Sequence, residues 1–114
     1  MSTKSKGNAA EIQAQRELEA DGWTVHRACR KAAYARGRII TKGHDIFGSD
    51  LIAKRKDRPT RWINVTTIEN KSAKVKEFAK YPWTFGLDIV EIWCKIPRKG
   101  WRKFGFAGKK WWEF

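Results

Sequence analysis

The segment that most constrains the fold of this chain is residues 88–96, which read Asp-Ile-Val-Glu-Ile-Trp-Cys-Lys-Ile. Apolar residues stand at every second position, at Val90, Ile92, Cys94 and Ile96, and this is the period of a β-strand. A strand with one apolar face pairs with other strands and packs that face on a core. The chain is therefore predicted to fold around a β-sheet.

Two segments carry helical patterns. Residues 8–21 are rich in strong helix formers, with Asn8 as the predicted N-cap, Glu11 at capping-box spacing and Gly22 just past the end. Residues 70–81 carry an apolar stripe at helical spacing and stop before a proline. We therefore expect two helices, one before and one within the run of strands.

Short runs of strand-forming residues predict the remaining strands, at 23–28, at 49–55, at 61–67 and in the tail. Residues 29–43 contain two glycines and are predicted to be mostly loop. This order predicts an α/β or α+β fold, of which we favour α/β, in which a small mixed sheet is flanked by helices, with a core of α-β-β-β-α-β. We expect a single domain over residues 1–114, with its core at 7–96 and a basic aromatic tail at 97–114.

The chain is strongly basic, with 25 Lys and Arg against 12 Asp and Glu and a formal net charge of +13. Such self-repulsion is typical of proteins that bind a polyanion, most often nucleic acid, although solubility or a ribosomal-type structural role would also use it. Two stretches, 27–42 and 98–110, contain several basic residues and no acid. Neither has a clean apolar face, and no apolar run reaches the ~20 residues of a membrane span, so we expect no membrane partner.

Cysteine content and the N-terminus predict the compartment. Two cysteines are too few for a disulfide framework or a four-thiolate zinc site. The polar start of the chain leads into no apolar segment of the kind found in secretory signals. An intracellular protein is therefore expected.

The few acidic residues suggest a metal site. The predicted elements can bring together Glu11, Asp50 and Asp45, with Asn64 and Thr66 on one face of the paired strand. Mg²⁺ is commonly held by one or two carboxylates with other oxygens and a substrate phosphate. A carboxylate on a basic, DNA-facing surface is unfavourable unless a cation lies beside it. Alternatively, Asp50 caps a strand and pairs with an arginine, and Asp45 is a turn residue.

A family resemblance rests on three motifs in order: Gly7-Asn-Ala-Ala-Glu11, Gly48-Ser-Asp50-Leu-Ile-Ala and Trp62-Ile-Asn64-Val-Thr66. Together they resemble the PD-(D/E)XK nuclease core, and most closely the archaeal and phage Holliday-junction resolvases. The resemblance spans about residues 5–81. It implies a restriction-endonuclease-like core and a homodimeric, Mg²⁺-dependent endonuclease, with Mn²⁺ as a possible substitute, that cuts branched DNA in an archaeal, bacterial or phage setting.

The chain departs from this family at its Glu-x-Lys motif, which here reads Asn64-Val65-Thr66. Residues Asp45 to Asp50, followed by Asn64-Val-Thr-Thr, are more similar to a branch that reads Asp-aromatic-Gly-x-x-Asp and then Gln-Val-Thr-Thr. Threonine cannot stabilise charge at a phosphate as lysine does. Another lysine would have to replace it, with Lys74 or Lys71 favoured over Lys54. All three lysines could instead be solvated phosphate contacts.

The resemblance assigns roles to the candidate residues. It implies that Asp50 is the principal metal ligand, that Glu11, Asn64 and Asp45 are secondary ligands, and that Thr66 is a ligand or positions water. Lys74 completes the predicted catalytic set. The predicted DNA-binding residues are basic: Arg27, Arg30, Lys31, Arg36, Arg38, Lys42, Lys71, Arg102 and Lys103. The alternative function is a non-catalytic nucleic-acid-binding module on a nuclease fold.

Aromatic residues in the tail allow two interpretations. Trp101, Trp111 and Trp112 lie among lysines and arginines. This mixture suits stacking on unpaired bases, and it equally suits a dimer interface.

Overall fold

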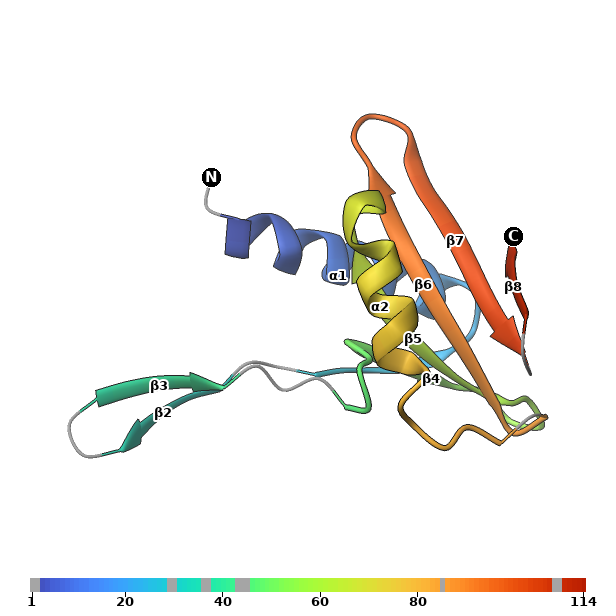
Figure 1. The fold of residues 1–114 in the computed structure, drawn as a ribbon, viewed down its shortest axis with the longest axis horizontal. Helices are drawn as coiled ribbons and strands as arrows, with labels where there is room; N and C mark the ends of the chain where they lie inside the picture. The colour runs from blue at the N-terminus through green and yellow to red at the C-terminus, as the bar shows by residue number, and fades with distance from the viewer. Residues whose placement is uncertain (1–2, 29–30, 36–37, 43–45, 85, 108–109) are drawn as a thin grey trace.

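The computed structural model describes residues 3–28, 31–35, 38–42, 46–84, 86–107 and 110–114, with side chains at 9–28, 46–84, 86–106 and 110–114. The elements follow in the order α1 (Thr3–Ala20), β1 (Thr24–Arg27), β2 (Lys31–Ala35), β3 (Arg38–Lys42), β4 (Leu51–Lys54), β5 (Thr60–Thr66), a 3₁₀ turn (Ile68–Asn70), α2 (Lys71–Phe78), β6 (Asp88–Ile96), β7 (Gly100–Ala107) and β8 (Lys110–Glu113). Figure 1 shows how these helices and strands are arranged.

Six of these strands form one mixed sheet in the order β1-β4-β5-β6-β7-β8. All neighbours in it are antiparallel except β5 and β6, which are parallel and joined through α2. The α/β class and the mixed sheet flanked by helices are thus confirmed. The tail supplies β7 and β8, which extend the same sheet.

The central strand β6 buries both of its faces. Val90, Ile92 and Cys94 are fully buried on one face, under the buried ring of Phe78 from α2. The intervening Trp93 is buried on the other face, together with residues of α1. Each face of the sheet therefore packs against one helix, and the strands alternate between the two cores.

Helix α1 ends where the sequence predicts and begins earlier. Gly22 has φ +93°. Its N–H donates to the carbonyl of Glu19, and the N–H of Trp23 donates to that of Leu18, which is the Schellman pattern at a helix C-terminus. At the other end, α1 starts at Thr3, so the prediction of Asn8 as N-cap is wrong.

Two other predicted boundaries need correction. The sequence pattern predicts a second helix over 70–81, but α2 stops at Phe78 and is preceded by a 3₁₀ turn. The pattern predicts mostly loop over 29–43, but β2 and β3 pair as an antiparallel ribbon within this stretch. The ribbon projects away from the six-stranded sheet (Figure 1). No helix in the described part of the chain is long and apolar enough to cross a membrane.

Candidate functional site

A tight turn over residues 46–49 leads the chain into β4. Ile46 and Ser49 exchange two backbone hydrogen bonds of 3.0 Å each. Phe47 and Gly48 both have positive φ, +52° and +81°, which is the pattern of a type I′ turn. Ser49 is fully buried, and its hydroxyl donates to the carbonyl of Ile46. This turn fixes the position of the Gly48 carbonyl and of the next residue, Asp50.

Asp50 lies beside Asn64 at the end of the β4–β5 pairing. The last paired residues are Leu51 and Ile63, and Asp50 precedes Leu51 by one residue. The backbone N–H of Asp50 donates to the Ile63 carbonyl at 2.8 Å, and its Oδ2 accepts from the backbone N–H of Val65 at 2.9 Å. The Asp50 carboxylate therefore continues the hydrogen bonding of the ladder, as the strand-capping alternative expects.

Asn64 is buried with one polar atom unsatisfied. Its residue is 2% exposed, and its Nδ2 donates to the Gly48 carbonyl at 2.8 Å. Its Oδ1 accepts no hydrogen bond from the described part of the protein. A buried acceptor without a partner costs about 1–3 kcal/mol. This oxygen is therefore the atom most in need of a ligand in the region.

These two residues fit a small oxygen-ligand site for a divalent cation. Asp50 supplies a carboxylate and Asn64 an amide oxygen, and Mg²⁺ is held by few protein oxygens when waters and a substrate phosphate complete its shell. Among the side chains that the structure describes, no three acidic, histidine or cysteine groups gather as a metal site. The fit therefore depends on the substrate supplying ligands.

Glu11 belongs to α1, which packs on the face of the sheet opposite to Asn64. Glu11 is half-buried on the face of α1 that carries Ala14 and Leu18, which pack with Ile63 of β5. Because side chains alternate along a strand, Asn64 points to the opposite face of β5. Thr66, two positions along, lies on the Asn64 side and is half-buried. Asp45, the remaining predicted ligand, lies outside the described residues.

The three candidate lysines differ in position. The Lys71 ammonium lies 4.0 Å from the ring centre of Phe104, on β7, and two strands away from β5. Lys54 is exposed at the last position of β4, away from the Asp50 end. Lys74 is half-buried on α2, which covers the Asn64 face of the sheet. Of the three, Lys74 keeps the position best suited to the predicted role.

The basic residues of the tail have partners within the protein. The Arg102 guanidinium bonds both carboxylate oxygens of Glu113 at 2.9 Å. Lys103 lies 3.6 Å from a Glu17 oxygen and 3.9 Å from the ring centre of Trp93. Arg102 therefore links β7 to β8, and Lys103 links β7 to α1.

The pKa values of three groups, Glu113, Arg102 and Cys94, are shifted by their surroundings. The hydrogen bond from Arg102 holds the pKa of Glu113 below its usual value, and the pKa of Arg102 is raised in turn. This bond favours the β7–β8 pairing above the unfolded pKa of Glu113 and is lost as the pH falls through the lowered value. Burial raises the pKa of the Cys94 thiol, which keeps it protonated and unreactive.

The first basic stretch forms the β2–β3 ribbon. Its register opposes Lys31 to Lys42 and Ala35 to Arg38. Arg30 and Arg36 lie outside the described residues, and Arg27 ends β1 on the sheet side of the ribbon.

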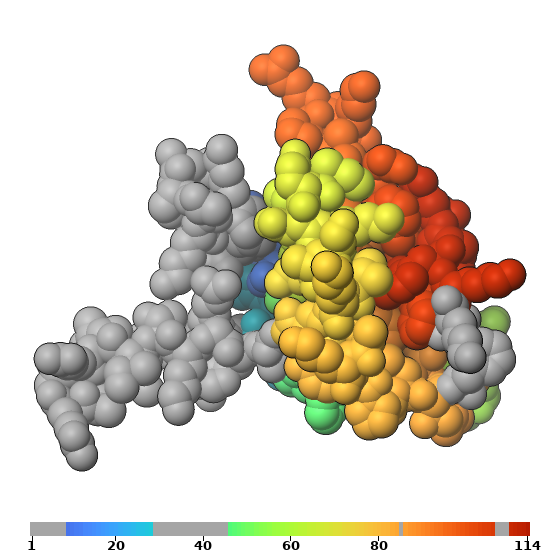
Figure 2. All heavy atoms as spheres, in the orientation of Figure 1, coloured from blue at the N-terminus to red at the C-terminus, as the bar shows by residue number. Residues whose placement is uncertain are grey.

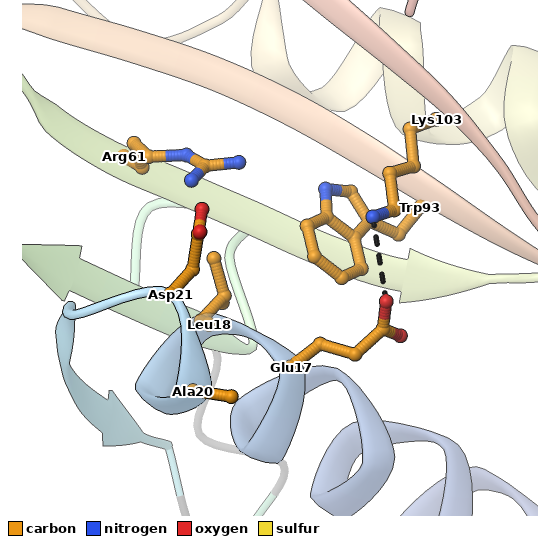
Figure 3. A pocket seen from close by; sticks show the side chains of 7 residues that line it. All are labelled: Glu17, Leu18, Ala20, Asp21, Arg61, Trp93 and Lys103. Atoms are coloured by element: carbon orange, nitrogen blue, oxygen red, sulfur yellow. Dashed lines mark ion pairs between the residues drawn. The ribbon is translucent and has the colours of Figure 1, made fainter.

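A pocket of about 350 Å³ lies between the end of α1 and the sheet (Figure 3). Glu17 and Asp21 approach it from the helix, Arg61 and Lys103 from the strands, and the Trp93 ring lies between them. Lys103 pairs with Glu17, and the lining holds as many acidic as basic side chains. This pocket therefore suits neither a phosphate nor a metal ion.

A buried ion pair is absent from the sequence-based predictions. Glu91 is 1% exposed, and its carboxylate accepts two hydrogen bonds from the Arg61 guanidinium, one of 2.7 Å, and one of 3.0 Å from the Trp93 indole. Arg61 also lies 4.9 Å from the Trp23 ring centre. The charge is fully satisfied, which indicates a structural role.

The tail tryptophans mostly pack within the sheet. Trp101 packs on the α1-side core, and Trp111 stacks on Phe106 at 5.0 Å. Trp112 is 42% exposed, with its ring against Gly105. A further exposed aromatic residue, Phe47, lies outside the tail, and no helical or strand period in the amino-acid sequence reveals it.

Comparisons with protein-family models, curated proteins and solved structures find no match to this chain.

Proposed function

We propose that this protein is a Mg²⁺-dependent endonuclease that binds and cuts DNA, with branched DNA such as a Holliday junction as its substrate. The observation that carries the proposal is the unsatisfied, buried Asn64 Oδ1 beside Asp50 on a basic protein. The element order α1-β1-β4-β5-α2-β6 supports a restriction-endonuclease-like core, because it follows the α-β-β-β-α-β order of that fold. We propose that the protein acts inside the cell.

In this proposal the chain's own residues hold and orient the reacting groups. Asp50 and Asn64 would hold Mg²⁺, which when bound supplies a Lewis acid and lowers the pKa of a water. The Gly48 carbonyl accepts a hydrogen bond from Asn64 Nδ2 and so fixes the orientation of the amide. Oδ1 is then left to bind a ligand. The Val65 N–H fixes the Asp50 carboxylate. Thr66 is on the same side of β5 and would orient water.

A positive charge near the scissile phosphate would come from Lys74. Lys74 is half-buried on α2, the helix whose Phe78 packs against Ile92, while the Lys71 ammonium lies over the Phe104 ring. Preorganised cations stabilise the charge that develops during phosphodiester hydrolysis. Lys74 therefore takes the role that the family assigns to the lysine of its Glu-x-Lys motif.

The test is cleavage of a four-way DNA junction in Mg²⁺ or Mn²⁺, with binding measured in Ca²⁺. Asp50→Asn should abolish cleavage and keep the fold, because an asparagine oxygen can still accept from Val65 N–H. DNA binding should stay the same or tighten, since a carboxylate leaves a phosphate-facing site. Asp57→Asn is the control. It makes the same charge change in an exposed turn at φ +62°, where asparagine is favoured.

The second candidate is a non-catalytic nucleic-acid-binding module, and one observation favours it. The Asp50 carboxylate already has a structural role as acceptor for Val65, so it needs no metal to explain its presence. If the wild-type protein cuts no junction in either metal, and Asp50→Asn binds DNA as the wild type does, the nuclease proposal fails. This second candidate then stands.

A further inference from the structure

Four aromatic rings gather at the surface beside Asp50 and Asn64, and we call Phe47, Trp62, Tyr81 and Trp83 the aromatic patch. The ring centre of Phe47 lies 5.8 Å from that of Trp62, 5.6 Å from Tyr81 and 6.4 Å from Trp83. The segments come from distant parts of the chain, and Figure 2 shows the green segment after residue 46 against the gold segment near residue 80. The fold therefore assembles the patch.

Phe47 is an unusual choice for its position. It occupies the first central position of the type I′ turn at φ +52°, where asparagine, aspartate or glycine is favoured and a bulky side chain is disfavoured. The residue nevertheless stays about half exposed, at 52%. The turn disfavours a phenylalanine here, and packing on the other three rings covers only part of it. A strained, exposed residue of this kind is a candidate for function.

The rings beneath Phe47 are held rigidly. The Trp62 indole donates to Asp88 Oδ1 at 2.9 Å, and the Trp83 indole donates to the Phe78 carbonyl at 2.8 Å. Phe78 itself is 1% exposed, so the core is closed below the patch. Phe47 thus packs on fixed aromatic rings and adds one more ring at the surface, outside the closed core.

The surroundings of the patch indicate its partner. Gly48, next to Phe47, bonds Asn64 through its carbonyl, so the patch adjoins the proposed phosphate site. Lys80 is exposed beside Tyr81, and the whole chain carries a net charge of +13. A ligand with phosphate groups and flat aromatic surfaces matches both features. Bases present a free face only where they are unpaired, and aromatic side chains stack on such bases.

We propose that the aromatic patch is a stacking platform for an unpaired DNA base, with Phe47 as the stacking ring. The inference rests on the proposed DNA-binding function and names the substrate feature that the site would recognise. It does not require that the DNA be cut. The preference would be for DNA with bulged, flapped or frayed bases over a fully paired duplex.

The experiment compares a blunt duplex with the same duplex carrying a three-base bulge that contains 2-aminopurine, both in Ca²⁺. The variants are Phe47→Asn, which suits the turn but lacks the ring, and Phe47→Trp, which keeps a stacking ring. Leu87→Asn is the matched control, because Leu87 is a 67% exposed apolar residue outside the patch. Affinity, 2-aminopurine fluorescence and the melting temperature are measured for each.

We expect the wild type to bind the bulged duplex about 5-fold or more tightly than the blunt one and to quench 2-aminopurine. Phe47→Asn should lose both the preference and the quenching, with unchanged blunt-duplex affinity and no loss of melting temperature. Phe47→Trp and Leu87→Asn should behave as the wild type.

Three results would overturn the inference. The first is blunt-duplex binding with no preference for the bulge, which leaves the proposed function intact. The second is a Phe47→Asn variant that melts well below the wild type, which makes Phe47 a packing residue. The third is a change from dimer to monomer in Phe47→Asn, which makes the patch a protein interface. Failure of the wild type to bind either DNA would reject the proposed function itself.

Discussion

Asn64 combines a fixed amide nitrogen with a buried amide oxygen that no described group satisfies. A hydrophobic residue at this position would be buried at a lower free-energy cost, because the neighbouring Ile63 and the strand partner Ile92 are both apolar and fully buried. Retaining an amide there costs free energy unless the oxygen meets a ligand. We therefore expect a ligand at this oxygen, and the proposed cation would supply one.

Replacing Asn64 by aspartate tests this. A carboxylate oxygen would face the Gly48 carbonyl that Asn64 Nδ2 now meets at 2.8 Å. We expect Asn64→Asp in EDTA to lose about 3 kcal/mol of unfolding free energy, because a charged group is left unpaired in the interior. Saturating Mg²⁺ should recover much of this loss, since a ligand that binds only the folded state stabilises it.

Thermal unfolding with and without Mg²⁺ measures both effects. Asn70→Asp, at an exposed position, is the control and should show neither change. An Asn64→Asp variant whose melting temperature responds to Mg²⁺ no more than that of the wild type would contradict a cation at this position.

Part of this geometry could be predicted from the amino-acid sequence. Strand alternation predicted that Asn64 and Thr66 share one face of β5, and they pair with Ile92 and Cys94, which both lie on the Phe78 side of the sheet. The hydrogen bond from Asn64 to Gly48 could not be predicted from the sequence, because it depends on a turn that has phenylalanine where glycine or asparagine is usual. The burial of Glu91 could not be predicted either. A single charge in an apolar strand gives no sign of the arginine that will neutralise it.

At the scale of elements, the β2–β3 ribbon concentrates charge away from the sheet. Its strands carry Lys31, Arg38 and Lys42, and basic residues are the groups that neutralise phosphates of a nucleic acid. A two-stranded β-ribbon is narrow enough to enter the major groove of DNA. We therefore expect the ribbon to bind phosphate groups.

Replacing Arg38 and Lys42 together by alanine should weaken duplex binding and reduce its log–log salt slope by about 1–2 units, one for each phosphate that is no longer neutralised. The measurement is affinity over a series of salt concentrations in Ca²⁺. Lys56→Ala with Arg58→Ala is the control, since both residues are exposed in the turn between β4 and β5. If the two double variants have equal log–log salt slopes, the ribbon does not contact DNA phosphates.

Prediction from sequence succeeded best for elements with a strong local period. The strand over 88–96 was confirmed because its alternation is unbroken. The ribbon was missed because Lys31–Ala35 is rich in alanine, a poor strand former, and becomes a strand only by pairing with Arg38–Lys42. Helix α2 was placed correctly but predicted too long, because Pro82 marks a limit and not the last helical residue.

At the scale of the whole molecule, the proposed substrate predicts the assembly. Four-way junctions are two-fold symmetric, and paired cuts need two active sites, which a C₂ homodimer supplies. Edge strand β8 and the residue after it expose Trp112 at 42% and Phe114 at 53%, more apolar surface than an edge needs in a monomer. We therefore expect a homodimer that uses the tail.

Sedimentation velocity at micromolar concentration, without DNA, measures the assembly. The expected result is a species of twice the 13.3 kDa chain mass. The pairing should persist at moderate salt, because an interface of tryptophan and phenylalanine is not screened by ions. A monomer under these conditions would argue against paired cutting and in favour of the simple binding module.

The β2–β3 ribbon is an insertion between β1 and β4, two strands that otherwise pair as a hairpin. Its neighbours β1 and β4 pair directly, from Thr24 opposite Lys54 to Arg27 opposite Leu51, and the N–H of Ala28 donates to the Asp50 carbonyl at 2.8 Å. The sheet is thus complete whatever joins these two strands. Loop-closure entropy rises by only about 0.6 kcal/mol for each doubling of loop length. Evolution can therefore lengthen, shorten or exchange this insertion, and so alter what the protein recognises, at little cost to the folding of the domain that carries it.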